Sequence, residues 1–120
     1  MTLLAAVQMT SGADKAQNLA TATALVRKAA RRGAQFVGLP ENFAWMGPEP
    51  ERDQNAESLE GPTLSALQSL AKELSVTLLA GSILEAGAPG GRLFNTSVLF
   101  GPDGARLGAY RKMHLFDVEV

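Results

Sequence analysis

Residues 3–9 (Leu-Leu-Ala-Ala-Val-Gln-Met) and residues 35–39 (Gln-Phe-Val-Gly-Leu) flank a helical pattern, and this arrangement decides the fold. Both are short, nearly continuous apolar runs, which are typical of strands buried on both faces of a parallel sheet. Between them, Asp14 has the character of a helix N-cap and Gly33 that of a helix stop. A strand, a helix and a strand in such a short stretch predict a βαβ unit with a right-handed crossover.

The remaining chain continues this pattern and then changes it. Pro62 begins a second helix as its first residue, and residues 76–80 form a third buried strand. Residues 83–85 and 93–100 surround a glycine-rich turn and predict an antiparallel hairpin, and residues 106–110 predict a further strand. We therefore expect an α/β fold in which a βαβαβ unit is followed by a β-meander, within a single domain of residues 1–120.

The composition excludes several classes of protein. The chain is 46% apolar and 19% charged, with a net charge of -1, which is unlike a disordered chain. Its apolar runs are much shorter than the roughly 18 residues of a membrane span, and its charge leaves no basic footprint for nucleic acid. We expect neither a membrane nor a nucleic-acid partner. Because no basic stretch precedes the first apolar run as in a signal peptide, we expect a cytoplasmic location.

The chain has no cysteine and one histidine, His114. Disulfides, cysteine zinc sites and a cysteine nucleophile are therefore excluded within these residues. A single histidine also leaves no obvious Ser-His-Asp arrangement, and it makes no metal site without several carboxylate partners. We expect no metal.

Glu41 follows the predicted strand 35–39, and function in such sheets tends to lie at the carboxyl ends of parallel strands. If Phe43 and Trp45 walled its carboxylate, desolvation would make that group a usable base near neutral pH. The alternative interpretation is a loop glutamate that caps a neighbouring segment, and spacing alone favours it.

Lys112 leaves the end of the last predicted strand between aromatic neighbours, where it could donate a hydrogen bond to a developing oxyanion. The alternative is a surface lysine in a basic cluster. His114 is more often a structural or capping residue than a ligand. Asn95 begins an Asn-Thr-Ser glycosylation pattern, but inside a strand we interpret it as a residue that bonds backbone near the site.

Four motifs occur together, namely Ala6-Val7-Gln8-Met9, Leu39-Pro40-Glu41-Asn42-Phe43, Phe94-Asn95-Thr96-Ser97 and Tyr110-Arg111-Lys112-Met113-His114-Leu115-Phe116-Asp117-Val118. In this order and spacing they resemble the nitrilase, or carbon-nitrogen hydrolase, superfamily over the whole chain. The form Lys-x-His-Leu-Phe-Asp-Val is similar to the deaminated-glutathione amidase and omega-amidase branch.

The resemblance implies a Glu-Lys-Cys triad that acts on non-peptide carbon-nitrogen bonds through a thioester. Glu41 matches the general base and Lys112 the residue that stabilises the tetrahedral intermediate, while Phe43, Asn95 and His114 are expected to contact the substrate. The substrate would be a small linear carboxamide, and no cofactor is needed. The family's cysteine follows the lysine motif by some tens of residues.

This chain ends eight residues after Lys112. The resemblance therefore implies the N-terminal half of an enzyme roughly twice as long, in which this incomplete domain supplies about half of a four-layer αββα sandwich. We expect the 120-residue chain alone to be inactive and the full-length form to be a homo-oligomer.

Two other functions stay open at this stage. One is a stand-alone, non-catalytic binding or scaffold protein of the same fold. The other is a small βαβ nucleotide-binding module. The sequence does not favour it, because Gly12, Gly81 and Gly101 do not form a G-x-G-x-x-G fingerprint.

Overall fold

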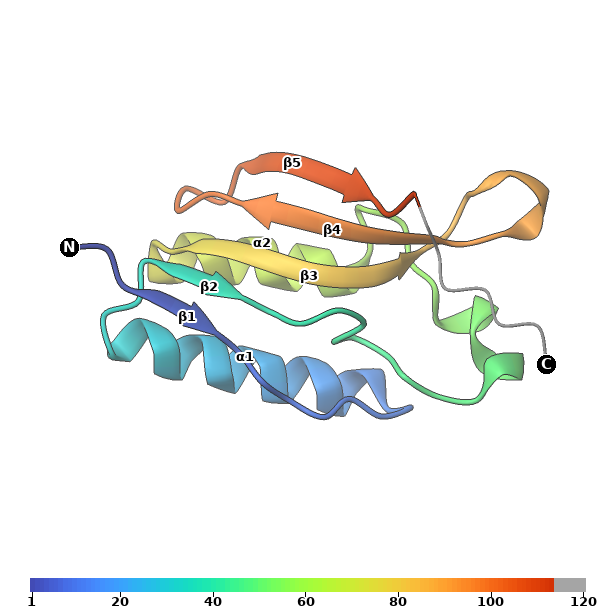
Figure 1. Cartoon of the computed structure of the whole chain (residues 1–120), viewed down its shortest axis with the longest axis horizontal. Coiled ribbons are helices and arrows are strands. Elements are labelled where there is room, and N and C mark those ends of the chain that lie inside the picture. Colours follow the sequence, from blue (N-terminus) through green and yellow to red (C-terminus); the bar gives the residue numbers. More distant parts are fainter. Residues whose placement is uncertain (114–120) are drawn as a thin grey trace.

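The computed structural model describes residues 1–113, which form one mixed sheet with two helices (Figure 1). The strands are β1 (Leu4–Ala6), β2 (Phe36–Gly38), β3 (Thr77–Glu85), β4 (Phe94–Phe100) and β5 (Arg106–Arg111), and the helices are α1 (Lys15–Arg31) and α2 (Pro62–Leu74). The strand order is β1-β2-β3-β4-β5, with β1, β2 and β3 parallel and the last two pairings antiparallel. The predicted βαβαβ unit and β-meander are confirmed.

Local signals set the helix ends. The carboxylate of Asp14 accepts a hydrogen bond of 3.0 Å from the backbone N–H of Gln17, which caps α1. Gly33 follows that helix with φ of 92°, a conformation that costs glycine little. Pro62 is the first residue of α2, where its missing N–H costs nothing.

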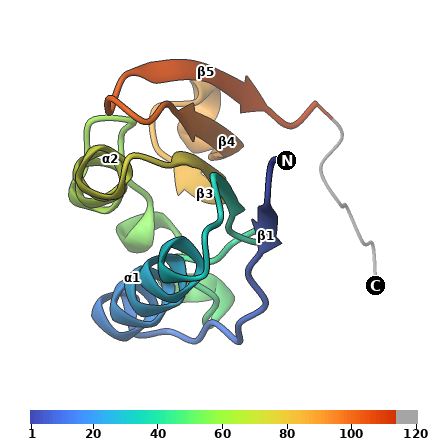
Figure 2. The same cartoon turned by 90° about the vertical axis from the view of Figure 1, so that its left-hand side faces the viewer.

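The two helices lie against one face of the sheet (Figure 2). The hydrophobic core is built from side chains of both helices and of the sheet. Its completely buried side chains are Ala22, Val26, Val37, Phe43, Leu67, Ala71, Leu78, Ala80 and Val98. Each large apolar side chain buried in this way stabilises the fold by about 1.5–3 kcal/mol. In the first turn of α1 the apolar Ala16 is exposed, whereas the polar Asn18 is buried.

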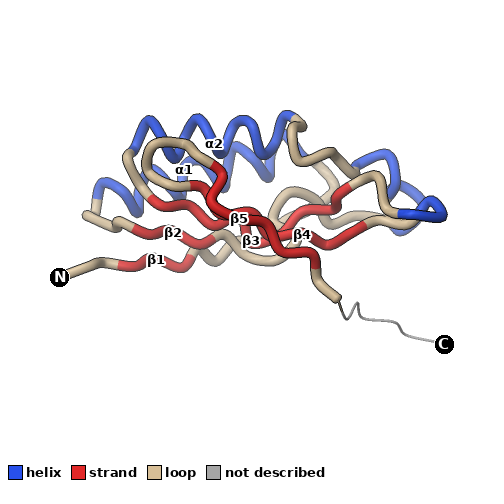
Figure 3. The backbone as a smooth tube through the Cα atoms, turned by 90° about the horizontal axis from the view of Figure 1, so that it is seen from above, coloured by secondary structure: helices blue, strands red, loops and turns tan. Residues whose placement is uncertain are grey.

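Both helices lie on the same side of the sheet (Figure 3). Within residues 1–113 the opposite face is open, and Leu79, Leu99 and Tyr110 line a shallow hollow on it. This arrangement of one sheet and one helical layer is half of the expected four-layer sandwich. Neither of the described helices is long and apolar enough to cross a membrane.

The expectation that residues 3–9 form a strand buried on both faces is wrong. β1 has only three residues, and Leu3 and Leu4 keep 46% and 68% of their surface exposed. The reason is that, among residues 1–113, β1 is an edge strand of a sheet that helices cover on one face only.

The two predicted segments 76–80 and 83–85 are one strand, β3, with a register shift between Ala80 and Ile83. Gly81 lies in this irregularity, and a Cβ there would fall 1.6 Å from the carbonyl oxygen of Leu39. Glycine is therefore required where β3 passes the end of β2.

Candidate active site

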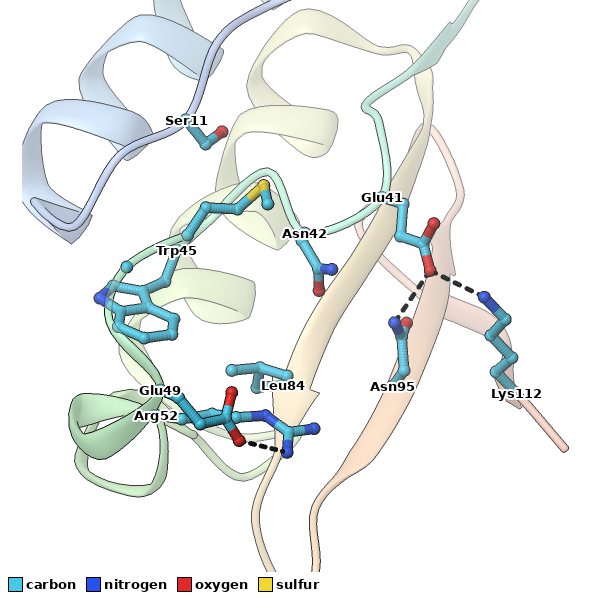
Figure 4. Close-up of a pocket in the computed structure, with 11 residues that line it drawn as sticks. Ser11, Glu41, Asn42, Trp45, Glu49, Arg52, Leu84, Asn95 and Lys112 are labelled. Carbon is cyan, nitrogen blue, oxygen red and sulfur yellow. Dashed lines mark hydrogen bonds and ion pairs between the residues drawn. The ribbon is translucent and has the colours of Figure 1, made fainter. Parts of the chain in front are cut away.

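A cleft of about 860 Å³ opens beyond the carboxyl ends of the parallel strands (Figure 4). Its lining residues are Ser11, Glu41, Asn42, Trp45, Met46, Gly47, Glu49, Arg52, Leu84, Asn95 and Lys112. This volume falls within the roughly 300–1,000 Å³ that is typical of small-molecule sites. The cleft lies where the rule on parallel strand ends predicts a functional site.

Glu41, Asn95 and Lys112 meet in this cleft although they come from three different parts of the chain. The ammonium group of Lys112 donates a hydrogen bond of 3.1 Å to Oε1 of Glu41, and Nδ2 of Asn95 donates one of 3.0 Å to the same oxygen (Figure 4). Glu41 and Lys112 thus point into one cleft. Within residues 1–113, Oε2 of Glu41 accepts no hydrogen bond, so one carboxylate oxygen stays available to a proton donor.

Solvent reaches this group of residues. The side chains of Glu41 and Lys112 are 54% and 42% exposed. A second hollow, which includes Ser97 and Tyr110, adjoins the same pair on the open face of the sheet. The desolvation expected around Glu41 is therefore not supplied by residues 1–113.

The other predicted site residues have different positions. Phe43 is completely buried in the hydrophobic core and does not line the cleft, although Trp45 does. The structure thus does not bring Phe43 to the place where we expect a substrate. His114 lies outside the described residues.

The backbone around Glu41 is held from two sides. The N–H of Asn42 donates a hydrogen bond of 2.9 Å to Oγ of Ser82, and Asn42 adopts a positive φ of 54°. Ser11 Oγ donates a hydrogen bond of 2.6 Å to the carbonyl oxygen of Phe43. Such uncommon backbone conformations persist where their surroundings enforce them.

Asn18 of α1 connects two of the loops that carry the cleft. Its Nδ2 donates hydrogen bonds of 2.8 and 2.9 Å to the carbonyl oxygens of Gly12 and Ala44, and its Oδ1 accepts one from the N–H of Gly12. The sequence reading missed Asn18 and Ser82. For Asn18, the available signal was a polar residue beside the apolar residues of α1, and this signal does not identify its hydrogen-bond partners.

Glu57 anchors the long loop that supplies Trp45 and Arg52 to the cleft. Its carboxylate pairs with Lys15 and accepts hydrogen bonds from the N–H and the hydroxyl of Thr63. Burial pushes the pKa of Glu57 upward, but the hydrogen bonds from Lys15 and Thr63 outweigh it, so the pKa lies below its ordinary value. Glu57 therefore carries its charge at neutral pH and joins the loop to both helices.

The charges in the cleft are paired. Lys112 contacts Glu41, and Arg52 lies 3.5 Å from Glu49 at the other end of the cleft. Among residues 1–113, no group of three or more His, Cys, Asp or Glu side chains is placed to hold a metal ion. The chemistry that this arrangement supports is proton transfer by a carboxylate next to a cationic hydrogen-bond donor.

Residues 3–120 match the sequence model of the family described as "Carbon-nitrogen hydrolase". The chain belongs to the carbon-nitrogen hydrolase family. It is 43% identical over 119 residues to a deaminated glutathione amidase of Synechocystis, covering 98% of this chain and 44% of the relative. It is 41% identical over 117 residues to the human omega-amidase NIT2, covering 98% of this chain and 42% of the relative.

Solved structures agree with this assignment. The Caenorhabditis elegans NitFhit protein superposes with a TM-score of 0.88 at 27% identity, covering 98% of this chain and 29% of that one. A CN-hydrolase superfamily protein of Xanthomonas campestris, solved with an arsenic adduct in its active site, superposes with a TM-score of 0.78 at 32% identity, covering 92% of this chain and 40% of that one. This carbon-nitrogen hydrolase chain thus spans less than half the length of the curated relatives it matches.

Proposed function

We propose that this chain supplies the general base and the oxyanion-stabilising lysine of an amidase-type carbon-nitrogen hydrolase. The observation that carries the proposal is the 3.1 Å contact between Lys112 and Glu41 inside the cleft. Family membership adds the reaction class, because the relatives named above are amidases. The substrate that we propose is a small linear carboxamide, and no cofactor takes part in the reaction.

The proposed reaction needs a thiol, which a cysteine outside residues 1–120 would supply. Oε2 of Glu41 takes the thiol proton while the sulfur attacks the carboxamide carbon, forming a C–S bond and a tetrahedral intermediate. The ammonium group of Lys112 donates a hydrogen bond to the negatively charged oxygen of that intermediate. When the C–N bond breaks, the proton held by Glu41 passes to the leaving nitrogen and ammonia departs.

Water completes the cycle. Glu41 accepts a proton from a water molecule, whose oxygen attacks the thioester carbon, and Lys112 again stabilises the oxyanion. Breaking the C–S bond returns the proton to the sulfur and releases the carboxylic acid. Asn95 holds Oε1 of Glu41 throughout, so the carboxylate presents its other oxygen to the reacting groups.

A stand-alone binding or scaffold protein is the second candidate. The observations that favour it are the lack of cysteine in the 120 residues and the open sheet face. Reading the gene beyond the codon of Val120, with mass spectrometry of the protein from its own cells, separates the two candidates. A frame that continues to a cysteine supports the enzyme, whereas a 120-residue protein in cells supports the binding module.

The activity test uses the protein expressed from its complete gene and measures ammonia release from small carboxamides. We expect Glu41→Gln and Lys112→Met to lower kcat by roughly 10³-fold or more, as loss of one member of a catalytic triad does. Glu73→Gln is the matched control, because Glu73 pairs with Arg27 on the exposed surface of the helices. Full activity in Glu41→Gln would overturn the proposal.

A homo-oligomeric full-length form, a cytoplasmic location and the absence of nucleic-acid and membrane partners stay predictions of the same proposal. Sedimentation of the purified protein tests the first, and cell fractionation tests the second.

A further inference from the structure

A buried carboxylate lies next to the site but takes no part in the proposed chemistry. Glu85, at the end of β3, has a side chain that is only 6% exposed. Nε and Nη2 of Arg111 donate hydrogen bonds of 2.9 and 2.6 Å to its two oxygens, and Oγ1 of Thr96 donates one of 2.7 Å to Oε1. The guanidinium group of Arg111 also lies 4.4 Å from the ring centre of Phe94. Two-point pairing of this kind fixes geometry as well as adding energy.

Arg111 immediately precedes Lys112, which contacts Glu41. Successive side chains of a strand point to opposite faces, so Arg111 reaches Glu85 on one face while Lys112 reaches Glu41 on the other. The backbone N–H of Lys112 donates a hydrogen bond of 2.9 Å to the carbonyl oxygen of Asn95, the residue whose side chain also holds Glu41. The position of Lys112 is thus set by the end of β5.

Apart from its backbone pairing with β4, β5 has few contacts that hold its end in place. In the described part of the chain it is at the edge of the sheet, and all six of its residues are exposed. Strand ends that bury little apolar surface open readily. Among residues 1–113, the side chain of Arg111 donates its hydrogen bonds to one buried group, the carboxylate of Glu85.

We propose that Glu85 and Arg111 form a clamp that holds Lys112 against Glu41, which makes Glu85 a positioning residue of the site. The existence of the clamp does not depend on the proposed function. Only the expected effect of the clamp on kcat rests on that function. The hydrogen bond from Arg111, opposed by burial, holds the pKa of Glu85 below its ordinary value, so the clamp is charged at neutral pH.

The direct test measures the reactivity of the Lys112 amine in the protein expressed from its complete gene. Brief labelling with acetic anhydride, followed by mass spectrometry, compares Lys112 with the exposed Lys28 and Lys72 in the same sample. In the wild-type protein we expect Lys112 to react more slowly than these two. Glu85→Gln should raise its rate by about two- to fivefold, the range that loss of an exposed ion pair implies.

Glu73→Gln is the matched control, because it removes a carboxylate from another two-point pair, with Arg27, that does not contact β5. It should leave the rate of Lys112 unchanged. Arg111→Lys is a second variant that keeps the charge but loses the two-point geometry, and it should raise the Lys112 rate as well. If circular dichroism shows that Glu85→Gln does not fold, the Arg111→Lys variant tests the clamp in its place. Wild-type reactivity of Lys112 in a folded clamp variant would overturn the proposal.

Kinetics supply the second measurement. In an active enzyme, Glu85→Gln should lower kcat by about 100-fold with little change in KM, since small misplacements of a catalytic group cost that much. If the wild-type protein is inactive but Glu85→Gln raises the labelling rate of Lys112, the proposed function is contradicted and the clamp is supported. An active enzyme whose kcat is unchanged in folded Glu85→Gln would contradict the clamp and leave the proposed function intact.

Discussion

The ammonium nitrogen of Lys112 lies 3.1 Å from Oε1 of Glu41, although 71 positions separate the two residues in the sequence. Glu41 follows β2, whereas Lys112 follows β5 at the far edge of the sheet. The two strands are not neighbours, so the contact depends on the pairing of β3 and β4 between them. Changes that shift this pairing should therefore act on the site from a distance.

Gly81→Ala should destabilise the fold and disturb the site together. A Cβ at this position would fall 1.6 Å from the carbonyl oxygen of Leu39, so β3 and the end of β2 must separate. Overpacking of this kind costs at least about 1–3 kcal/mol in the free energy of unfolding. Urea unfolding measures the loss. Gly108→Ala is the control, since a Cβ there meets nothing within 4 Å, and equal stabilities of the two variants would contradict this account.

Asn18→Ala should loosen the loops that carry the cleft. The substitution leaves the buried carbonyl oxygen of Ala44, and the partly buried one of Gly12, without the donor they have in the native fold. A buried polar group left unpaired costs about 1–3 kcal/mol. We expect a lower urea midpoint and faster hydrogen exchange at the N–H of Gly12. Gln17→Ala, on the exposed side of α1, should have a much smaller effect, and a reversed order of the two would count against this role.

Stability should decline in acid. The pKa values of Glu57 and Glu85 lie below the ordinary 4.5, the first because hydrogen bonds from Lys15 and Thr63 outweigh burial and the second because Arg111 binds it. A carboxyl group whose pKa is lower in the folded protein stabilises the fold above the unfolded pKa and loses this effect as the pH falls through the folded pKa.

We therefore expect the free energy of unfolding to decrease as the pH drops below about 4.5, which is the ordinary pKa from which the pKa values of both glutamates are lowered. Urea unfolding at a series of pH values measures this. Glu57→Gln should be less stable than wild type at pH 7 and should show a shallower decline in acid. A decline as steep as that of wild type would rule out Glu57 as a source of the effect.

The 120-residue chain by itself should release no ammonia from small carboxamides, because it contains no cysteine to form the thioester. A sensitive ammonia assay on the purified chain checks this. Release that depends on Glu41 would show that the proposed mechanism is wrong.

The same isolated chain should aggregate or fold only in part. Its open sheet face carries Leu79, Leu99 and Tyr110, and each Å² of apolar surface left in water forfeits roughly 25 cal/mol. A few hundred Å² is thus comparable to a whole marginal stability of about 5–15 kcal/mol. Size-exclusion chromatography and urea unfolding test this. A soluble monomer with one steep transition would instead support the stand-alone binding module.

The site could be predicted only in part from the sequence. Glu41 was found because it follows a strand in a parallel sheet, and the family motif singled out Lys112. Asn18, Ser82 and Glu85 were missed. The side-chain hydrogen-bond partners of these three residues lie between 6 and 40 positions away in the sequence, so no local pattern distinguishes them from surface residues.

The sequence by itself determined both ends of α1, the start of α2 and the order of the strands and the two α-helices. The N-cap Asp14, the stop at Gly33 and the initial Pro62 act through their own backbone neighbours, so their effects are readable without the fold. Only the tertiary structure decided the length of β1, the exposure of Leu4, the burial of Phe43 and the clamp on Arg111. Burial and strand pairing depend on what lies across the sheet, and that is set by chain segments distant in sequence.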